Sequence, residues 1–464
     1  MRTSFLFILC IFLCSFSIKA QDTLVIVGNI QLLGNKVTKD KIMLREITFR
    51  PGDTLGKQLL AQKIKSSKDN LMNTSLFNFV ETSDSIVSVE GIKKVEVTFD
   101  VIERWYIWPL PIFELAERNF NAWLQTKDLS QINYGMFLDW KNFRGRRETL
   151  KILLQFGYDE KIGFSYGIPY IDKKQTIGLD FGFSQTKNHQ VSYATIDNQV
   201  ERVRLEAYAR RAYSAFVAIG HRPDIYQSHY FEASYYDHIY DDTIFQINPE
   251  FYKGEGHRPQ YLKLSYAFKN DHRDFKPFPL KGYYFDFLLE QTGLGFFHRS
   301  DINILSAKVN ARKYWTFSRR FFFAGGVTGR IANNNSNPYF LNQGVGYGRD
   351  FVRGYEFYVV DGQNYGILKT DFKFAIVPQQ VTTLKFIPIQ SFNKIPWAIY
   401  LSLFGDAGYV PGEALNGNDL QNSLLIGYGA GLNLVTYYDI VFRLEYSFNH
   451  KGERGFFIHF MASI

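Results

Sequence analysis

Two short motifs in this 464-residue chain hold side chains that can bind each other by charge. The motif residues are Val352, Arg353, Gly354 and Tyr355, and then Phe404, Asp406 and Gly408. A guanidinium can bind a carboxylate through two parallel hydrogen bonds, and a buried carboxylate without a partner is costly. We therefore expect Arg353 to bind Asp406. Gly354 would permit an unusual backbone angle, and Gly408 would leave room opposite.

Other kinds of chemistry find little support in the sequence. Five possible metal ligands lie close together in sequence: His229, Asp237, His238, Asp241 and Asp242. His229 and His238 would face opposite sides of a strand, so a polar loop flank is the ordinary explanation. No nucleophile elbow, phosphate-binding glycine loop or metalloprotease His-Glu pair occurs. We expect no enzymatic activity, no cofactor and no metal site.

The start of the chain and its composition predict export. Residues 1–20 read as a signal peptide, with Arg2 before the apolar run from Phe5 to Cys14. The only cysteines, Cys10 and Cys14, lie in that segment, which excludes thiol chemistry from the mature chain. The formal charge of +8 comes from scattered basic residues, which argues against a nucleic-acid partner. No later stretch is long and apolar enough for a membrane-spanning helix.

Residues 22–104 and 105–464 follow different patterns. The first segment predicts a small, water-soluble α+β domain of order β-α-α-β-β. The second alternates apolar and small or polar residues with period two, as in Leu424 to Leu434. Aromatic residues make 17% of the chain, which favours a transmembrane antiparallel β-barrel of about 16 strands over a secreted β-sandwich array.

The barrel pattern places the motifs. The sixth strand would begin near residue 203, and the thirteenth near residue 397, with Asp406 on its lumen face. A loop over about residues 333–363 would precede the twelfth strand and fold into the barrel. The last strand would run from Gly455 to Ile464, with Ile464 facing lipid. The first strand holds Pro109 and Pro111, which either suit a weakly paired edge or simply mark the join between the two domains.

These features together resemble a known family. Gly34 to Thr38, Leu44-Arg45-Glu46, Pro51-Gly52-Asp53 and Leu76-Phe77 resemble a POTRA domain, the polypeptide-transport-associated module. The two motifs resemble the V-R-G-F/Y motif of the sixth extracellular loop and the F-x-D-x-G motif of the thirteenth strand in the BamA-type outer-membrane insertase and translocase superfamily. This chain has room for one POTRA domain, whereas the best-known insertases carry several.

The resemblance implies a location and a role. The barrel would lie in the outer membrane among its lipids, with the POTRA domain in the periplasm. It would insert or translocate unfolded outer-membrane or secreted polypeptides, using the POTRA sheet edge and a lateral seam of the barrel. Accessory periplasmic or lipoprotein partners are possible. The alternatives are a secretion pore for one protein, similar to two-partner secretion transporters, and a passive porin.

Overall fold

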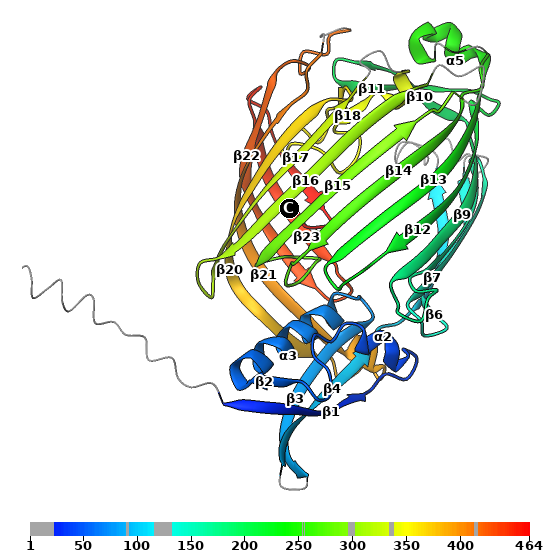
Figure 1. Ribbon diagram of the computed structural model, residues 1–464. Coiled ribbons are helices and arrows are strands. Elements are labelled where there is room, and N and C mark those ends of the chain that lie inside the picture. The colour runs from blue at the N-terminus through cyan, green and yellow to red at the C-terminus, as the bar shows by residue number, and fades with distance from the viewer. Residues whose placement is uncertain are drawn as a thin grey trace, which may run out of the picture.

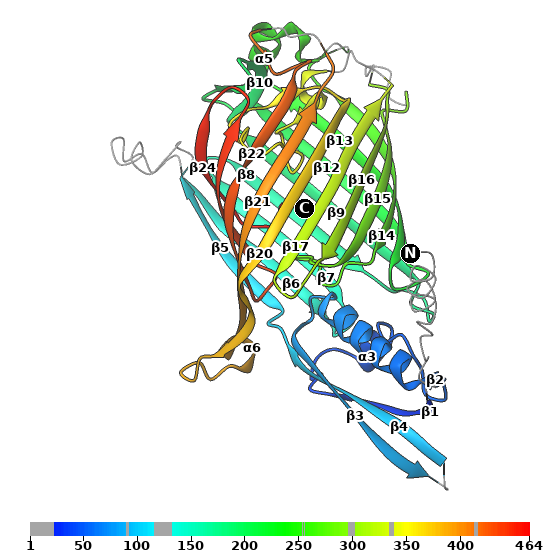
Figure 2. The same cartoon turned by 90° about the vertical axis from the view of Figure 1, so that its left-hand side faces the viewer.

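The computed structural model describes residues 23–89, 92–115, 132–252, 254, 256–295, 302–333, 338–412 and 416–464. The predicted signal peptide therefore lies outside the described residues. Figures 1 and 2 show a small domain below a tall, tilted-strand barrel. Within the described ranges, no helix has the length and apolar character needed to cross a membrane.

The N-terminal domain packs two helices on a four-stranded sheet. Its elements are β1 (Leu24–Leu33), α2 (Asp40–Leu44), β2 (Thr54–Gly56), α3 (Lys57–Met72), β3 (Phe77–Val89) and β4 (Ile92–Glu103). The sheet order is β2-β1-β4-β3, with β1 parallel to β4. Leu60 and Leu71 of α3 are buried in a core that also contains Val97 and Phe99 of β4. The short strand β2, absent from the predicted order, pairs with β1 directly before α3.

In the described part of the chain after the N-terminal domain, sixteen strands form one antiparallel sheet. Its strands are β5 (Ile107–Leu115), β6 (Ile132–Phe143), β7 (Glu148–Gly157), β8 (Glu160–Ile168), β9 (Ile177–Asn188), β12 (Arg210–His221), β13 (Gln227–Tyr240), β14 (Gln260–Asp271), β15 (Gly282–Thr292), β16 (Ile304–Thr316), β17 (Phe321–Ala332), β20 (Tyr365–Thr383), β21 (Lys394–Tyr409), β22 (Leu424–Thr436), β23 (Val441–Asn449) and β24 (Arg454–His459). The predicted strand number is confirmed.

Strand β21 shows how the sequence sets the two faces. Leu401 and Leu403 point outward and are 39% and 55% exposed, whereas Ser402, Phe404 and Asp406 point inward and are buried. Apolar outside and polar inside is the arrangement of a barrel whose outer face contacts lipid.

The barrel has a seam between its first and last strands. The sheet order runs from β24 to β5, and no ladder joins these two strands within the residues that the structure describes. Strand β24 spans only six residues. Pro109 and Pro111 in β5 have no backbone N–H to donate. Figure 2 shows both strands on the same side of the barrel.

A hairpin closes over one mouth of the barrel, formed by β10 (Gln190–Ile196) and β11 (Gln199–Arg204). At its tip, the backbone N–H of Asn198 donates to the Asn418 side chain at 2.7 Å. Its carbonyl accepts from the N–H of Val359 at 2.8 Å. The hairpin leaves the wall between the fifth and sixth strands, while Asn418 lies between the thirteenth and fourteenth, half a circumference away. The predicted start of the sixth strand near residue 203 is therefore wrong: that segment belongs to the hairpin, and the strand begins at Arg210.

The C-terminal residues leave the sheet and turn into the lumen. Strand β24 ends at His459, so the prediction of a strand to Ile464 is wrong. Ser463 donates to the lumen carboxylate of Asp371 at 2.9 Å. Ile464 is 3% exposed and packs with Tyr314 of β16 and Ala324 of β17. Ile464 is therefore buried in the lumen instead of facing lipid. Both views place the C-terminus within the outline of the barrel (Figures 1 and 2).

Candidate functional site

The connection between β17 and β20 folds into the barrel. Its described part holds η3 (Tyr339–Leu341), β18 (Gln343–Val345) and β19 (Val360–Asp361). Val352, Arg353 and Tyr355 are at most 2% exposed. Val352 and Tyr355 pack in one cluster with Tyr365 and Ile367 of β20 and Leu425 of β22, so the loop is part of the lumen filling.

Arg353 and Asp406 form a two-pronged ion pair. Arg353 Nε and Nη2 donate to the two Asp406 carboxylate oxygens at 2.8 and 2.6 Å. The backbone N–H of Arg353 also donates to Asp406, at 3.2 Å. The guanidinium lies over the ring of Phe404, 3.9 Å from its centroid, and donates to the Thr370 carbonyl at 2.9 Å. We call this pair and its two motifs the loop lock.

Glycines on both sides allow the loop to approach the wall. Gly354 has a φ of +92°, and a Cβ there would lie 2.8 Å from the Phe448 carbonyl oxygen. A Cβ on Gly408 would lie 2.5 Å from the Val352 side chain. Both motif glycines are therefore needed because a Cβ would not fit between the loop and the barrel wall, and Gly354 is also needed for its backbone angle.

Tyr355 fastens the end of the motif. Its hydroxyl bonds to the His450 ring and donates to the Ile426 carbonyl. The structure thus brings all seven motif residues together: Val352, Arg353, Gly354, Tyr355, Phe404, Asp406 and Gly408.

The sequence reasoning missed a second row of buried charges around Arg353. Arg353 Nη1 lies 3.6 Å from Glu445 and 3.9 Å from Asp371. Arg443 and Lys373, both at most 2% exposed, accompany these carboxylates. Arg443 and Glu445 alternate with the apolar Phe442 and Leu444, which indicates a lumen-facing position, but only the folded loop shows which charges Arg353 meets.

The possible metal ligands on β13 and just after it do not converge. His229 bonds to the Tyr266 hydroxyl, and Asp237 binds Arg258 at 2.6 and 2.8 Å. Within the described part of the chain, His229, Asp237, His238, Asp241 and Asp242 form no group of three donors.

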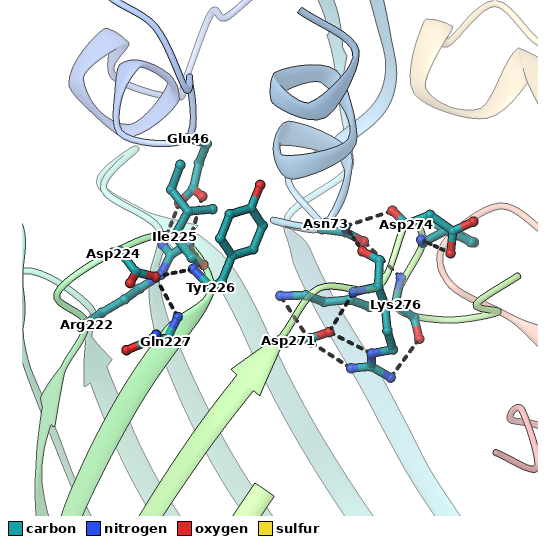
Figure 3. A network of polar contacts seen from close by, with 12 residues as sticks. Glu46, Asn73, Arg222, Asp224, Ile225, Tyr226, Gln227, Asp271, Asp274 and Lys276 are labelled. Carbon is teal, nitrogen blue, oxygen red and sulfur yellow. Dashed lines mark hydrogen bonds and ion pairs between the residues drawn. The ribbon is translucent and has the colours of Figure 1, made fainter. Parts of the chain in front are cut away.

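A second polar site joins the N-terminal domain to the barrel rim. Glu46, 2% exposed, accepts from Arg222 Nη1 and Nη2 at 2.6 and 2.8 Å, and Arg147 adds a contact at 3.3 Å. Burial alone would raise the pKa of Glu46, but the two guanidinium groups hold that pKa below its ordinary value. Figure 3 shows Glu46 reaching the rim turn that carries Arg222. Glu46 is thus held as a carboxylate in the interface.

Further contacts fix the domain at separate turns. Asn73 donates to the Asp274 carbonyl at 2.9 Å and accepts from the Lys276 N–H at 2.9 Å (Figure 3). Arg104 donates to both Asp439 oxygens at 2.8 Å. Burial opposes ionisation of Asp439, yet Arg104 keeps its pKa low. We call these contacts, together with the binding of Glu46 to Arg222 and Arg147, the rim dock.

Two protein-family models match this chain, one over the barrel and one over the N-terminal domain. The Omp85 superfamily domain matches residues 142–456. The POTRA family described as a surface antigen variable number repeat matches residues 25–104. No curated protein gives a sequence match.

The solved structures that resemble this chain do so at low identity. CdiB from Escherichia coli is 12% identical, with a TM-score of 0.51 over 94% of this chain and 75% of that chain. BamA from Haemophilus ducreyi lacking POTRA domains 1–3 is 17% identical, with a TM-score of 0.48 over 94% and 83%.

Proposed function

Since this chain belongs to the Omp85 superfamily, we propose that it lies in the outer membrane and inserts polypeptides into that membrane or moves them across it. Its POTRA domain would lie in the periplasm, where unfolded polypeptides arrive.

The seam between β5 and β24 carries this proposal. Strand β5 pairs on one side with β6, and its other side has no ladder among the described strands. An unpaired strand side is a template for pairing with another chain. An incoming strand could therefore add to the barrel there and then leave sideways into lipid. Phe113, which is 72% exposed, faces outward on this strand opposite the exposed Tyr134 of β6.

The POTRA sheet offers a second template. Strand β3 has thirteen residues and lies at the sheet edge, paired only with β4 within the described sheet. An extended client can add to such an edge through main-chain hydrogen bonds. The start of β3 is tied to the barrel, because Asn78 donates to the Ser391 carbonyl at 2.7 Å in the turn before β21. A client on β3 would be held at the rim.

The filled lumen argues against a passive porin. The loop lock, the hairpin of β10 and β11, and the C-terminal residues all occupy the inside or the mouth of the barrel. A diffusion channel needs an open water-filled path. The loop lock would be a structural and gating element in this proposal, with no catalytic role.

Depletion of the protein, followed by quantitative proteomics of the outer membrane and the medium, tests the proposal. Loss of many unrelated barrels would support a general insertase. Loss of one secreted or surface protein would support the alternative of a dedicated secretion pore. Complementation with the wild-type gene should restore either defect, and Arg353→Met should restore it only in part. Unchanged membrane and secreted proteins, with slower uptake of small solutes, would refute the proposal in favour of a porin.

A further inference from the structure

Three side chains form a cluster where the in-folded loop meets the last two strands. Glu356 follows the loop motif, Glu445 lies on β23 and His459 ends β24. Nε2 of His459 lies 3.5 Å from a Glu356 oxygen and 3.5 Å from a Glu445 oxygen. All three donor atoms lie within 4.8 Å of one another. Residues distant in sequence thus point their ligand atoms at one small volume.

These atoms are buried without hydrogen-bond partners. Among the described residues, Oε1 of Glu356, both Glu445 carboxylate oxygens and Nε2 of His459 make no hydrogen bond. Glu445 is 1% exposed. Burying polar groups in this way is costly, and such atoms in a native fold call for a bound ion, water or proton.

The neighbours hold the cluster in place. The other Glu356 oxygen accepts from the Gly354 N–H at 2.8 Å. The ring of Phe351 stacks on His459 with centroids 5.5 Å apart. Supporting contacts of this kind orient metal ligands.

Two arginines lie close to the site and add positive charge near Glu445. Arg443 and Arg353 approach Oε1 of Glu445, at 3.3 and 3.6 Å. Oε2 is the Glu445 oxygen that faces His459. The guanidinium groups would repel a cation, but they lie at Oε1 of Glu445, whereas the proposed ligand atom is Oε2.

We propose that Glu356, Glu445 and His459 bind a divalent transition-metal ion of the Zn²⁺ class. A tetrahedral ion with bonds of about 2.1 Å holds its ligand atoms about 3.4 Å apart, close to the two separations of 3.5 Å. An imidazole with two carboxylates suits Zn²⁺, whereas Ca²⁺ and Mg²⁺ prefer oxygen ligands alone. The ion ties the loop to β24 beside the seam. This inference does not depend on the proposed function.

Metal titration of the purified full chain tests the site. The protein should carry no polyhistidine tag and should first be stripped with a chelator. Isothermal titration with ZnCl₂ should give one ion per chain, with Mg²⁺ and Ca²⁺ far weaker. His459→Gln should weaken Zn²⁺ binding by more than about tenfold, since even indirect supports of a ligand are worth that much. His229→Gln, whose ring bonds to Tyr266, should bind like wild type.

A second variant and a spectrum keep the result clear if His459→Gln folds poorly. Glu356→Gln keeps the side-chain shape and should also weaken binding, and X-ray absorption of the zinc-loaded protein should show one imidazole and oxygen ligands. Equal Zn²⁺ binding by wild type and both variants would overturn the site. An absence of saturable Zn²⁺ binding to the wild-type protein would overturn it as well.

Discussion

Replacing Arg353 by methionine removes the guanidinium from the loop lock while keeping a long side chain. The variant loses both side-chain hydrogen bonds to Asp406, the bond to the Thr370 carbonyl and the stacking on Phe404. Asp406, only 4% exposed, keeps one hydrogen bond from the loop backbone. A carboxylate would thus remain buried without its counter-charge.

The expected cost is large because the pair is buried on both sides. Removing one partner of a buried ion pair costs about 3–5 kcal/mol of unfolding free energy. Asp406→Asn should cost less than Arg353→Met, since Arg353 keeps the carboxylates of Glu445 and Asp371 at 3.6 and 3.9 Å. The double variant Arg353→Met/Asp406→Asn removes both charges, so its loss should fall short of the sum by about 0.5–3 kcal/mol.

The free energy of unfolding is measured by urea titration of the barrel folded in lipid vesicles, followed by tryptophan fluorescence. Arg349→Met is the matched control, because Arg349 lies in the same loop with an exposed side chain. It should change the free energy by no more than about 0.5 kcal/mol. Additive losses in the double variant, or a wild-type value for Arg353→Met, would refute the loop lock. Exchanging the two charges should recover only part of the loss, since the contacts with Thr370 and Phe404 stay broken.

Three further perturbations test other features. Burial raises the pKa of Asp69 in α3 to about 6, so the folded domain loses stability as the pH rises from the ordinary pKa of 3.8 through about 6. Asp69→Asn should raise the melting temperature near neutral pH and flatten this pH dependence. An unchanged dependence of the melting temperature on pH would contradict the raised pKa. Asp439→Asn removes the charge that binds Arg104 and should cost the rim dock about 1.5–3 kcal/mol, seen as faster hydrogen exchange in residues 437–440 with barrel strands unchanged. Gly326→Val should expel the C-terminal residues, because a Cβ there lies 3.1 Å from Ile464, and carboxypeptidase should then remove them faster than in the Gly325→Val control, whose nearest atom is at 3.7 Å. Equal digestion of the two glycine variants would argue against a seated C-terminus.

The sequence was most informative where the period-two alternation alone determines which side chains face the lumen. Alternation along residues 397–408 placed Phe404, Asp406 and Gly408 on the lumen face, and the cost of a buried carboxylate pointed to Arg353. Both inferences use local spacing and one charge argument. The number of strands followed from the same spacing applied to the whole segment.

Features that depend on long-range placement escaped the sequence. Apolar and polar residues alternate in β10 and β11 as they do in a barrel strand. Local sequence does not determine whether such a pair of strands joins the barrel wall or crosses the mouth. The positive φ of Asp197 and Asn198 marks a hairpin turn, and Asp-Asn between two alternating runs was a readable signal for it. The rim dock depends on Glu46 meeting Arg222, which lies 176 positions away.

The inward course of the last residues matters for anyone who engineers this protein. Any segment that continues the chain past Ile464 starts from inside the barrel, beside Tyr314 and Gly326. A fluorescent protein or affinity tag fused there would have to displace these residues or thread past the loop lock. The turn at Asn416 and Gly417, with φ of +53° and +75°, touches the hairpin tip through the Asn416 carbonyl and is also a poor insertion point. The turn at Ser318 between β16 and β17 is exposed, on the same rim as the N-terminal domain, and is the better insertion point for a short tag.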